Sequence, residues 1–337
     1  MAIEWLRCGH HVYIVSTWRG SRAASIMLYH LLLQTVNTQQ SSGVSHGQLH
    51  LLQYDLHDGE AVIKAVNDLS RAARGGKLYV ITDEVESELR IKIFESFCNK
   101  LLTRVPSLHL WAAGCFPEHR PAGLQVKHLT RPLRSPPVVV KEDDQDLRIT
   151  RGRDVDPYSE RGVPDHTDDL SVTRLYHRGQ GHSGDWPGDC VMCGREVASF
   201  LHSLRVGVKE SSTTTSTTST STFGSTTPPC LQWRDVLVLS WRYVSDQSGV
   251  VTGLQEAGIP ARVMEGEDIE DAVTARSDLV WVTNGPVYGL ERKVVVCLEY
   301  SDFDSMSFTG FYRDSVCSPR LDLVSRSTSQ LVIVSPD

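Results

Sequence analysis

Residues 77–84 read Lys77-Leu78-Tyr79-Val80-Ile81-Thr82-Asp83-Glu84, an apolar strand pattern that ends in two adjacent carboxylates. A short apolar run rich in β-branched and aromatic residues is typical of a strand covered on both faces of a sheet. Along the chain, segments with similar strand patterns alternate with segments whose apolar residues recur at helical spacing. The expected strands are His11–Ser16, Leu49–Tyr54, Lys77–Thr82 and Leu108–Ala113, and the expected helices are a short one ending near Cys8, then Ser21–Thr35, Glu60–Ala73 and Leu89–Val105.

The same alternation returns in the last third of the chain. Strands are predicted at Asp235–Ser240, Ala261–Met264, Leu279–Thr283, Lys293–Leu298 and Gln330–Val334, with helices at Gly249–Ala257 and Asp268–Ala275. Strands that alternate with helices indicate βαβ units and a parallel sheet. Trp111 and Trp281 fall within predicted strands, so both are expected in the core.

We therefore predict an α/β fold with two parallel-sheet domains, residues 1–138 and 231–337, separated by a loop-rich, partly disordered insertion at 139–230. Few apolar residues occur between Lys141 and Asp169. In Ser211–Pro229, 15 of 19 residues are Ser or Thr, a composition typical of a flexible linker.

Composition bounds the class of protein. With 337 residues, 40% hydrophobic and 22% charged, the chain is expected to fold rather than to be disordered. A net charge of −7 argues against strong non-specific nucleic-acid binding. The sequence contains no apolar run of about 18 residues, so no membrane span is predicted. Charged residues interrupt the first 15 positions, so no secretory leader is expected. The eight thinly spread cysteines favour a reducing, intracellular setting, nuclear or cytoplasmic.

Asp83 and Glu84 form the first candidate site. Ligands of open α/β sheets bind beyond the C-terminal ends of the strands. There, an Asp can hold Mg²⁺ while a Glu orients an attacking water, as in phosphoryl transfer. The alternative is that both residues simply begin the acidic helix that follows. The phosphate-binding loop G-x-x-x-x-G-K-[ST] is absent from the sequence.

A second candidate site is His177-x4-His182-x7-Cys190-x2-Cys193. Two thiolates and two imidazoles are able to bind Zn²⁺ tetrahedrally, and nearby glycines allow the required turns. Three interpretations stay open: a structural zinc site, two reduced cysteines at the surface, and a redox pair.

Six segments follow one another in the order of motifs Ia to VI of superfamily-1 helicases. They are HVYIVSTWRGS, KLYVITDE, LHLWAAG, HLTRPLRSPP, VWVTNGPVYGLERKVVV and DLVSRSTSQLVIV. The chain therefore resembles the tandem RecA-like motor of the UvrD/Rep type, over roughly residues 1–138 and 231–337. More closely, it is similar to uncharacterised helicase-like P-loop proteins of marine invertebrates.

The resemblance implies a role for each matching residue at a nucleotide site. Asp83 would coordinate Mg²⁺ and Glu84 would activate water. Arg134 and Arg326 would contact the γ-phosphate of ATP across the two domains.

It also implies roles at the domain interface and on nucleic acid. Gly289 and Glu291 would lie at the nucleotide and inter-domain interface. Ser16 and Thr17 would face single-stranded DNA or RNA. Trp18 follows a strand and would stack on a base, although packing within its loop is the alternative.

The departures from the family pattern limit the functional prediction. The phosphate-binding loop is missing, and Gly114 is followed by Cys115 instead of the usual acidic residue. We expect a helicase-like P-loop NTPase or its C-terminal part, inactive alone, in which ATP and Mg²⁺ are bound only by a fuller protein. The alternative is a non-catalytic binding or scaffold protein that retains the helicase fold.

Overall fold

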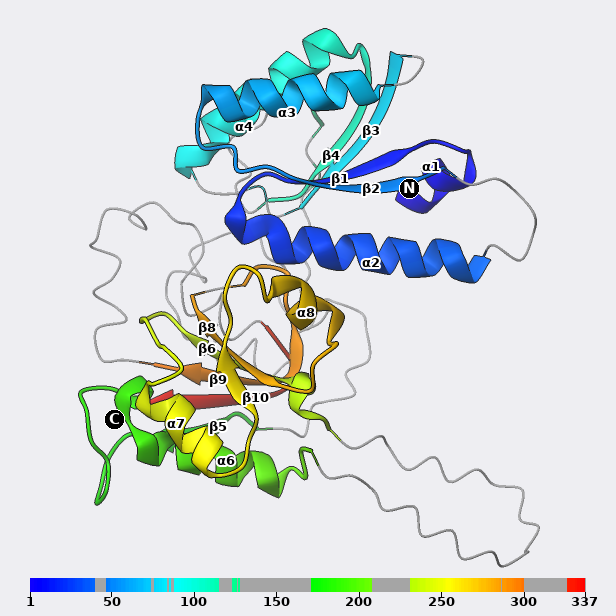
Figure 1. Ribbon diagram of the computed structural model, residues 1–337. Coiled ribbons are helices and arrows are strands. Elements are labelled where there is room, and N and C mark those ends of the chain that lie inside the picture. The colour runs from blue at the N-terminus through cyan, green and yellow to red at the C-terminus, as the bar shows by residue number, and fades with distance from the viewer. Residues whose placement is uncertain are drawn as a thin grey trace, which may run out of the picture.

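The computed structural model of the chain describes residues 1–39, 47–73, 76–83, 85, 88–114, 123–125, 127, 171–207, 231–285, 287–299 and 326–336. Their strands form one sheet of four strands and one of six, and neighbouring strands run parallel throughout. Figure 1 shows the two sheets, each with its own helices, and helix α2 (Arg22–Gln39) running between them. The predicted α/β class is confirmed.

The first sheet has the strand order β2-β1-β3-β4. Its strands are β1 (Val12–Ser16), β2 (Leu49–Gln53), β3 (Lys77–Thr82) and β4 (Ser107–Ala112). Strand β1 pairs on both sides and is buried along its whole length, as expected from its apolar sequence. The predicted ends of these four strands agree with the structure to within one residue.

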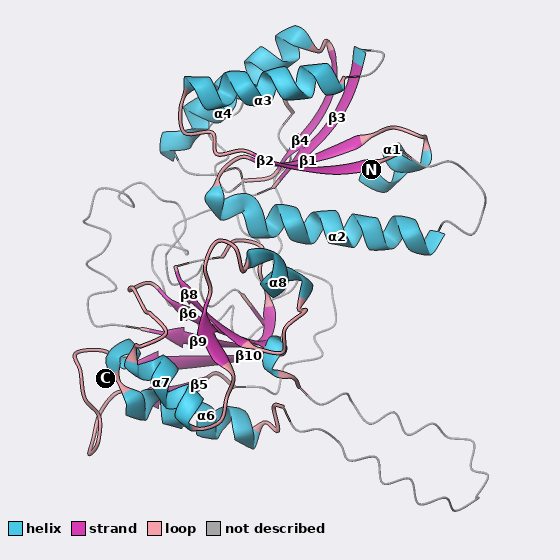
Figure 2. Cartoon of the chain, in the orientation of Figure 1, coloured by secondary structure: helices cyan, strands magenta, loops and turns pink. Residues whose placement is uncertain are grey.

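Helices cover both faces of this sheet, as the connections between parallel strands require. On one face lie α1 (Ala2–Arg7) and α2, where Leu6 and Val36 pack on Val12 and Tyr79. The other face carries a larger core around the fully buried Phe97. Figure 2 shows the two helices that cover this face. These helices are α3 (Gly59–Ala72) and α4 (Glu88–Arg104).

The second sheet has the strand order β5-β10-β9-β6-β8-β7. Its strands are β5 (Thr173–Tyr176), β6 (Val236–Ser240), β7 (Ala261–Val263), β8 (Val280–Asn284), β9 (Arg292–Leu298) and β10 (Ser327–Ser335). Strand β6 is central and fully buried. The strands predicted after residue 231 are confirmed.

Two separate cores flank the second sheet. On one face, valines of β6, β8, β9 and β10 pack against helices α6 (Val191–Ser203) and α7 (Gly249–Glu256). The other face includes Trp281, which is 2% exposed, and is covered in part by the short helix α8 (Ile269–Thr274). Within the described ranges, no helix is both long and apolar enough to cross a bilayer.

The structure differs from the predicted division of the chain at residues 171–207. These residues belong to the segment expected to be a loop-rich insertion, yet they form β5 and α6 of the second sheet. β5 was missed because its four residues, Thr173–Tyr176, contain no apolar run, in keeping with their alternating half-buried and exposed positions at the sheet edge. The rest of the expected insertion, residues 139–170 and 208–230, lies outside the described residues.

Trp111 is a second correction. It lies in β4 as predicted but is 52% exposed, because β4 is the edge strand of its sheet. Helices α1 and α2 cover the part of their sheet face that lies over β1. On β4, Trp111 and His109 stay exposed to solvent.

The core under α4 supplies a direct test of this packing. Phe97→Ala should lower the free energy of unfolding by about 3–5 kcal/mol, because the phenyl ring is fully buried and its removal leaves a cavity. Leu102→Ala on the same helix is the control, since this side chain is 43% exposed and should cost less than about 1 kcal/mol. Urea unfolding measures both, and equal losses would contradict the packing described.

Candidate metal centre

Four potential metal ligands converge beside α6. His177 directly follows β5, and its backbone N–H donates to the carbonyl of Ser335 at the end of β10. Cys190 is the N-cap of α6 and Cys193 lies in the first turn of that helix. His182 comes from the loop between β5 and α6. One ligand atom from each of the four residues lies within 4.8 Å of the others, so this group is able to hold a metal ion.

The spacing of these atoms matches tetrahedral coordination. Nδ1 of His182 lies 3.6 Å from Sγ of Cys190 and 3.5 Å from Sγ of Cys193. Nδ1 of His177 lies 3.3 Å from Sγ of Cys193. Zinc bonds of about 2.3 Å to sulfur and about 2.05 Å to nitrogen, at tetrahedral angles, place the two ligand atoms about 3.6 Å apart. The side chains therefore surround a space of the size that one tetrahedral ion needs.

The outer ring nitrogens of both histidines have acceptors. Nε2 of His177 lies 3.1 Å from the carbonyl oxygen of Gly184, and Nε2 of His182 lies 3.3 Å from Oε1 of Glu196. A donor role for both Nε2–H groups leaves the Nδ1 lone pairs directed at the centre. Histidine ligands of metals usually have such an outer acceptor, which fixes the tautomer and the ring orientation. Gly184 reaches this position with φ +84°, a conformation that favours glycine.

The cysteines are part of the core. Cys190 and Cys193 are both 0% exposed and pack with Trp186 and Val250. Both are free thiols, but because both are buried the interpretation as two surface cysteines is wrong. Burial raises the pKa of Cys193 above its ordinary value, and Cys190 and Glu196 add to this effect. A metal that binds here must therefore displace the thiol proton.

All four ligand candidates named from the sequence are thus brought together, whereas Glu196 was missed. It lies three residues after Cys193 on α6, on the same helix face. An acidic residue at that spacing from a ligating cysteine was the available signal.

The carboxyl-terminal edge of the first sheet holds a second set of predicted residues. Ser16 ends β1, and Asp83 follows the adjacent strand β3 and is half-buried. Ser16 and Thr17 are 0% and 4% exposed. The hydroxyl of Ser16 lies 2.9 Å from that of Ser21, whose oxygen also accepts from the backbone N–H of Thr17. The side chain of Ser16 is thus used to build the turn into α2 and is shielded from solvent.

Several predicted residues meet where the two sheets come together. The ring of Trp18 lies 5.6 Å from that of Tyr288, and the guanidinium of Arg326 lies 5.5 Å from the same tyrosine ring. Gly289 touches α2: a Cβ built on it would lie 2.6 Å from Cα and Cβ of Ala24. We call Trp18, Ala24, Tyr288, Gly289 and Arg326 the junction cluster. It joins the turn after β1 to the connection between β8 and β9.

The remaining predicted residues are divided between described and undescribed parts of the chain. Glu291 is half-buried and directly precedes β9, two residues after Gly289. Glu84 and Arg134 lie outside the described residues.

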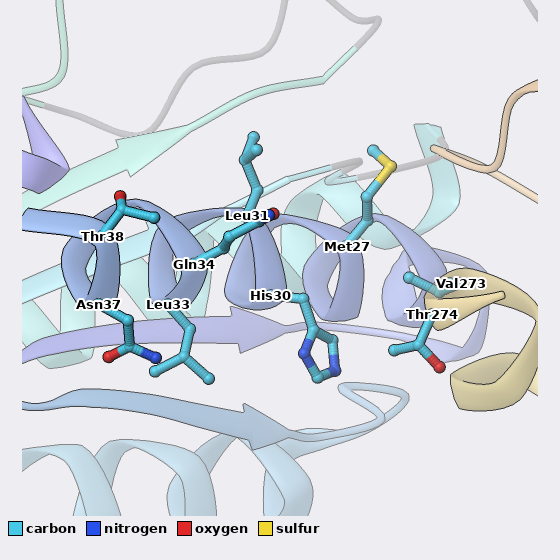
Figure 3. Close-up of a pocket in the computed structure, with 9 residues that line it drawn as sticks. All are labelled: Met27, His30, Leu31, Leu33, Gln34, Asn37, Thr38, Val273 and Thr274. Carbon is cyan, nitrogen blue, oxygen red and sulfur yellow. The ribbon is translucent and has the colours of Figure 1, made fainter. Parts of the chain in front are cut away.

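A groove of about 720 Å³ lies along α2 beside the end of α8. Figure 3 shows its lining, which includes Met27, His30 and Leu31 of α2 and Val273 and Thr274 of α8. None of the nine lining residues is Asp, Glu, Lys or Arg, and none was predicted as a site residue. This lining offers no charged group to a phosphate or a metal.

The junction cluster is tested by two glycines in the same connection. Gly285 and Gly289 both have positive φ, +90° and +81°, so alanine at either should cost about 1–2 kcal/mol of backbone strain. A Cβ at Gly285 meets nothing within 4 Å, whereas one at Gly289 collides with Ala24. Gly289→Ala should therefore destabilise the protein by about 1–3 kcal/mol more than Gly285→Ala in urea unfolding. Equal effects of the two substitutions would show that the junction is not closely packed.

Comparison with known proteins adds no relative to this description. No protein-family model and no curated protein matches the sequence. Function is therefore inferred from the geometry of the metal-ligand group, the sheet edges and the junction cluster.

Proposed function

We propose that the chain binds one Zn²⁺ through Nδ1 of His177, Nδ1 of His182 and the thiolates of Cys190 and Cys193. The observation that carries this proposal is the convergence of four ligand atoms within 4.8 Å. The donor set supports zinc, because two cysteines and two histidines are a common ligand set of four-coordinate structural zinc sites.

The role proposed for the ion is structural. Four protein ligands complete a tetrahedral zinc site and leave no open position for water or substrate, in contrast to catalytic zinc sites with three protein ligands. The buried position of Cys190 and Cys193 supports this role. The ion would join the segment after β5 to the first turn of α6, and so hold the edge strand to the rest of the second sheet.

We also propose that the chain is a helicase-like P-loop NTPase, or its C-terminal part, with ATP-dependent action on nucleic acid. The contact between the two sheet units at the junction cluster supports this proposal, because Trp18 and Gly289 form it and Arg326 packs on Tyr288 beside it. Asp83 follows β3 at the sheet edge where ligands of such folds bind. There it would hold Mg²⁺, with Glu84 beside it.

The first sheet has room for a further nucleotide-binding strand. In the described part of the chain, β4 pairs with β3 and has no partner on its other edge, where Trp111 is exposed. A parallel strand joined to β1 by a helix on the α1 and α2 face would, with a right-handed crossover, lie on the β4 side of β1. Because β3 and β4 already occupy the positions next to β1 on that side, the additional strand would pair with the free edge of β4. A phosphate-binding loop after that strand would lie near Asp83.

A non-catalytic binding or scaffold protein is the second candidate. The observation that favours it is the absence of G-x-x-x-x-G-K-[ST] from these 337 residues. Of the three residues proposed to contact nucleic acid, Ser16 and Thr17 are buried, and Trp18 is half-buried with its ring against Tyr288.

Zinc binding is tested by metal analysis of the purified chain. We expect about one equivalent of zinc by mass spectrometry, and Cys193→Ser should lose it because a sulfur ligand is removed. Cys8→Ser is the matched control, since Cys8 is exposed and distant in sequence from the site. Glu196→Gln should weaken zinc binding about 10–100-fold, because the acceptor of His182 loses its charge. Protein without zinc, or equal zinc in Cys193→Ser, would contradict the proposal.

The proposal of a helicase-like NTPase is tested first by sequencing the 5′ end of the transcript and then by assaying the protein. We expect in-frame coding sequence upstream of Met1 that contains the missing phosphate-binding loop. The longer protein should hydrolyse ATP, and Asp83→Asn should lower kcat at least about 100-fold because a Mg²⁺ ligand is lost. Asp55→Asn, a carboxylate after β2 on the same sheet edge, should leave kcat unchanged. An upstream sequence without the loop, or Glu84-dependent hydrolysis by residues 1–337 alone, would contradict this proposal.

A further inference from the structure

Helices α6 and α7 touch through their backbones beside the metal ligands. A Cβ built on Gly194, directly after Cys193, would lie 2.3 Å from the carbonyl oxygen of Val250 and 2.9 Å from Cα of Gly253. A Cβ on Gly253 would lie 2.2 Å from the carbonyl oxygen of Val191. No side chain separates the two helices at this crossing, so a shift of one must move the other.

A third glycine extends this contact to the ligand residue itself. A Cβ built on Gly249, the first residue of α7, would lie 2.2 Å from the carbonyl oxygen of Asp189 and 2.7 Å from the backbone nitrogen of Cys190. The N-termini of α6 and α7 are therefore packed against each other where Cys190 supplies its sulfur to the metal-ligand group.

The loop after β6 is tied to the same place. The guanidinium of Arg242 lies 5.4 Å from the ring of Trp186, and the indole N–H of Trp186 donates to Oδ2 of Asp189 at 2.6 Å. Trp186 is 4% exposed and belongs to the core that contains Cys190. Arg242 comes two residues after β6, the central strand, and α7 begins seven residues further along.

We infer that metal binding by His177, His182, Cys190 and Cys193 fixes α7 and the loop after β6, so that loss of the metal loosens the carboxyl-terminal edge of the second sheet. This inference rests on the proposed binding of zinc. The ion cross-links the segment from His177 to Cys193, which carries Trp186 and Asp189. Without the ion, the four side chains no longer share a common bonding partner and hold this segment less firmly, and the backbone contacts pass the loss of order to α7.

Hydrogen exchange of the full chain tests the inference. Zinc-loaded and chelator-treated protein are compared by mass spectrometry, with the zinc content of each sample measured. Amides of residues 241–256 should exchange at least 10-fold faster after zinc removal, whereas those of α3 (Gly59–Ala72), in the first sheet, should not change. Loss of zinc with unchanged exchange in α7 would overturn this inference and leave zinc binding intact. A chain that never holds zinc would overturn both.

A substitution at the helix crossing tests the same coupling in reverse. Because coupling is reciprocal, weakening the α6–α7 contact must weaken metal binding. Gly253→Ala should lower zinc affinity at least 10-fold in competition with a chromophoric chelator. Gly59→Ala in α3 is the matched control, since a Cβ there meets nothing within 4 Å, and its zinc affinity should be unchanged. A folded Gly253→Ala protein with full zinc affinity would overturn the inference. If this variant does not fold, hydrogen exchange of the unaltered chain decides the question.

Discussion

Parallel pairing of every strand in the described ranges is the constraint on which the rest of the structure depends. Two parallel neighbours cannot be joined by a tight turn, so each connection must cross a face of the sheet. In the first sheet these crossings are α2 on one face, and α3 and α4 on the other. In the second sheet, α7 crosses one face, while the connection that contains Tyr288 and Gly289 crosses the other. The junction cluster exists because this last crossing faces α2.

The metal-ligand group lies beside a short edge strand of the second sheet. β5 has four residues, Thr173–Tyr176, and pairs with β10 at an edge of the sheet. Such a strand gains little from burial, since its side chains alternate between half-buried and exposed. Its C-terminal neighbour His177 and the N-cap Cys190 of α6 bring ligands together across the loop between them. Four ligands around one ion would provide the link that a short edge strand cannot provide alone.

The sequence predicted the fold well wherever a strand is buried on both faces. Runs such as Val236–Ser240 and Lys77–Thr82 are apolar, and their ends agree closely with the structure. It failed at two edge positions, although the edge strands β2 and β7 were predicted. β5 (Thr173–Tyr176) contains no apolar run, and Trp111 is exposed because β4 has an open side. A residue's place in a sheet depends on partners distant in sequence, and these cannot be read from local periodicity.

The metal-ligand group and the junction cluster also differ in how much of each could be predicted from local sequence. The four ligands at His177, His182, Cys190 and Cys193 could be named from spacing because they lie within 17 residues of one another. Tyr288 could not, since its contacts with Trp18 and Arg326 come from strand order and not from local sequence.

The pairing of β5 with β10 also governs the order in which the second sheet is assembled during synthesis. Val332 lies opposite Thr173, so their pairing joins residues separated by more than 150 positions. Contacts over such a separation form slowly, because a long loop must first be closed. The ligands from His177 to Cys193 emerge from the ribosome long before β10 does. Metal capture by this short segment would therefore prepare the edge strand and α6 in advance, and the last strand of the chain would close the sheet onto them.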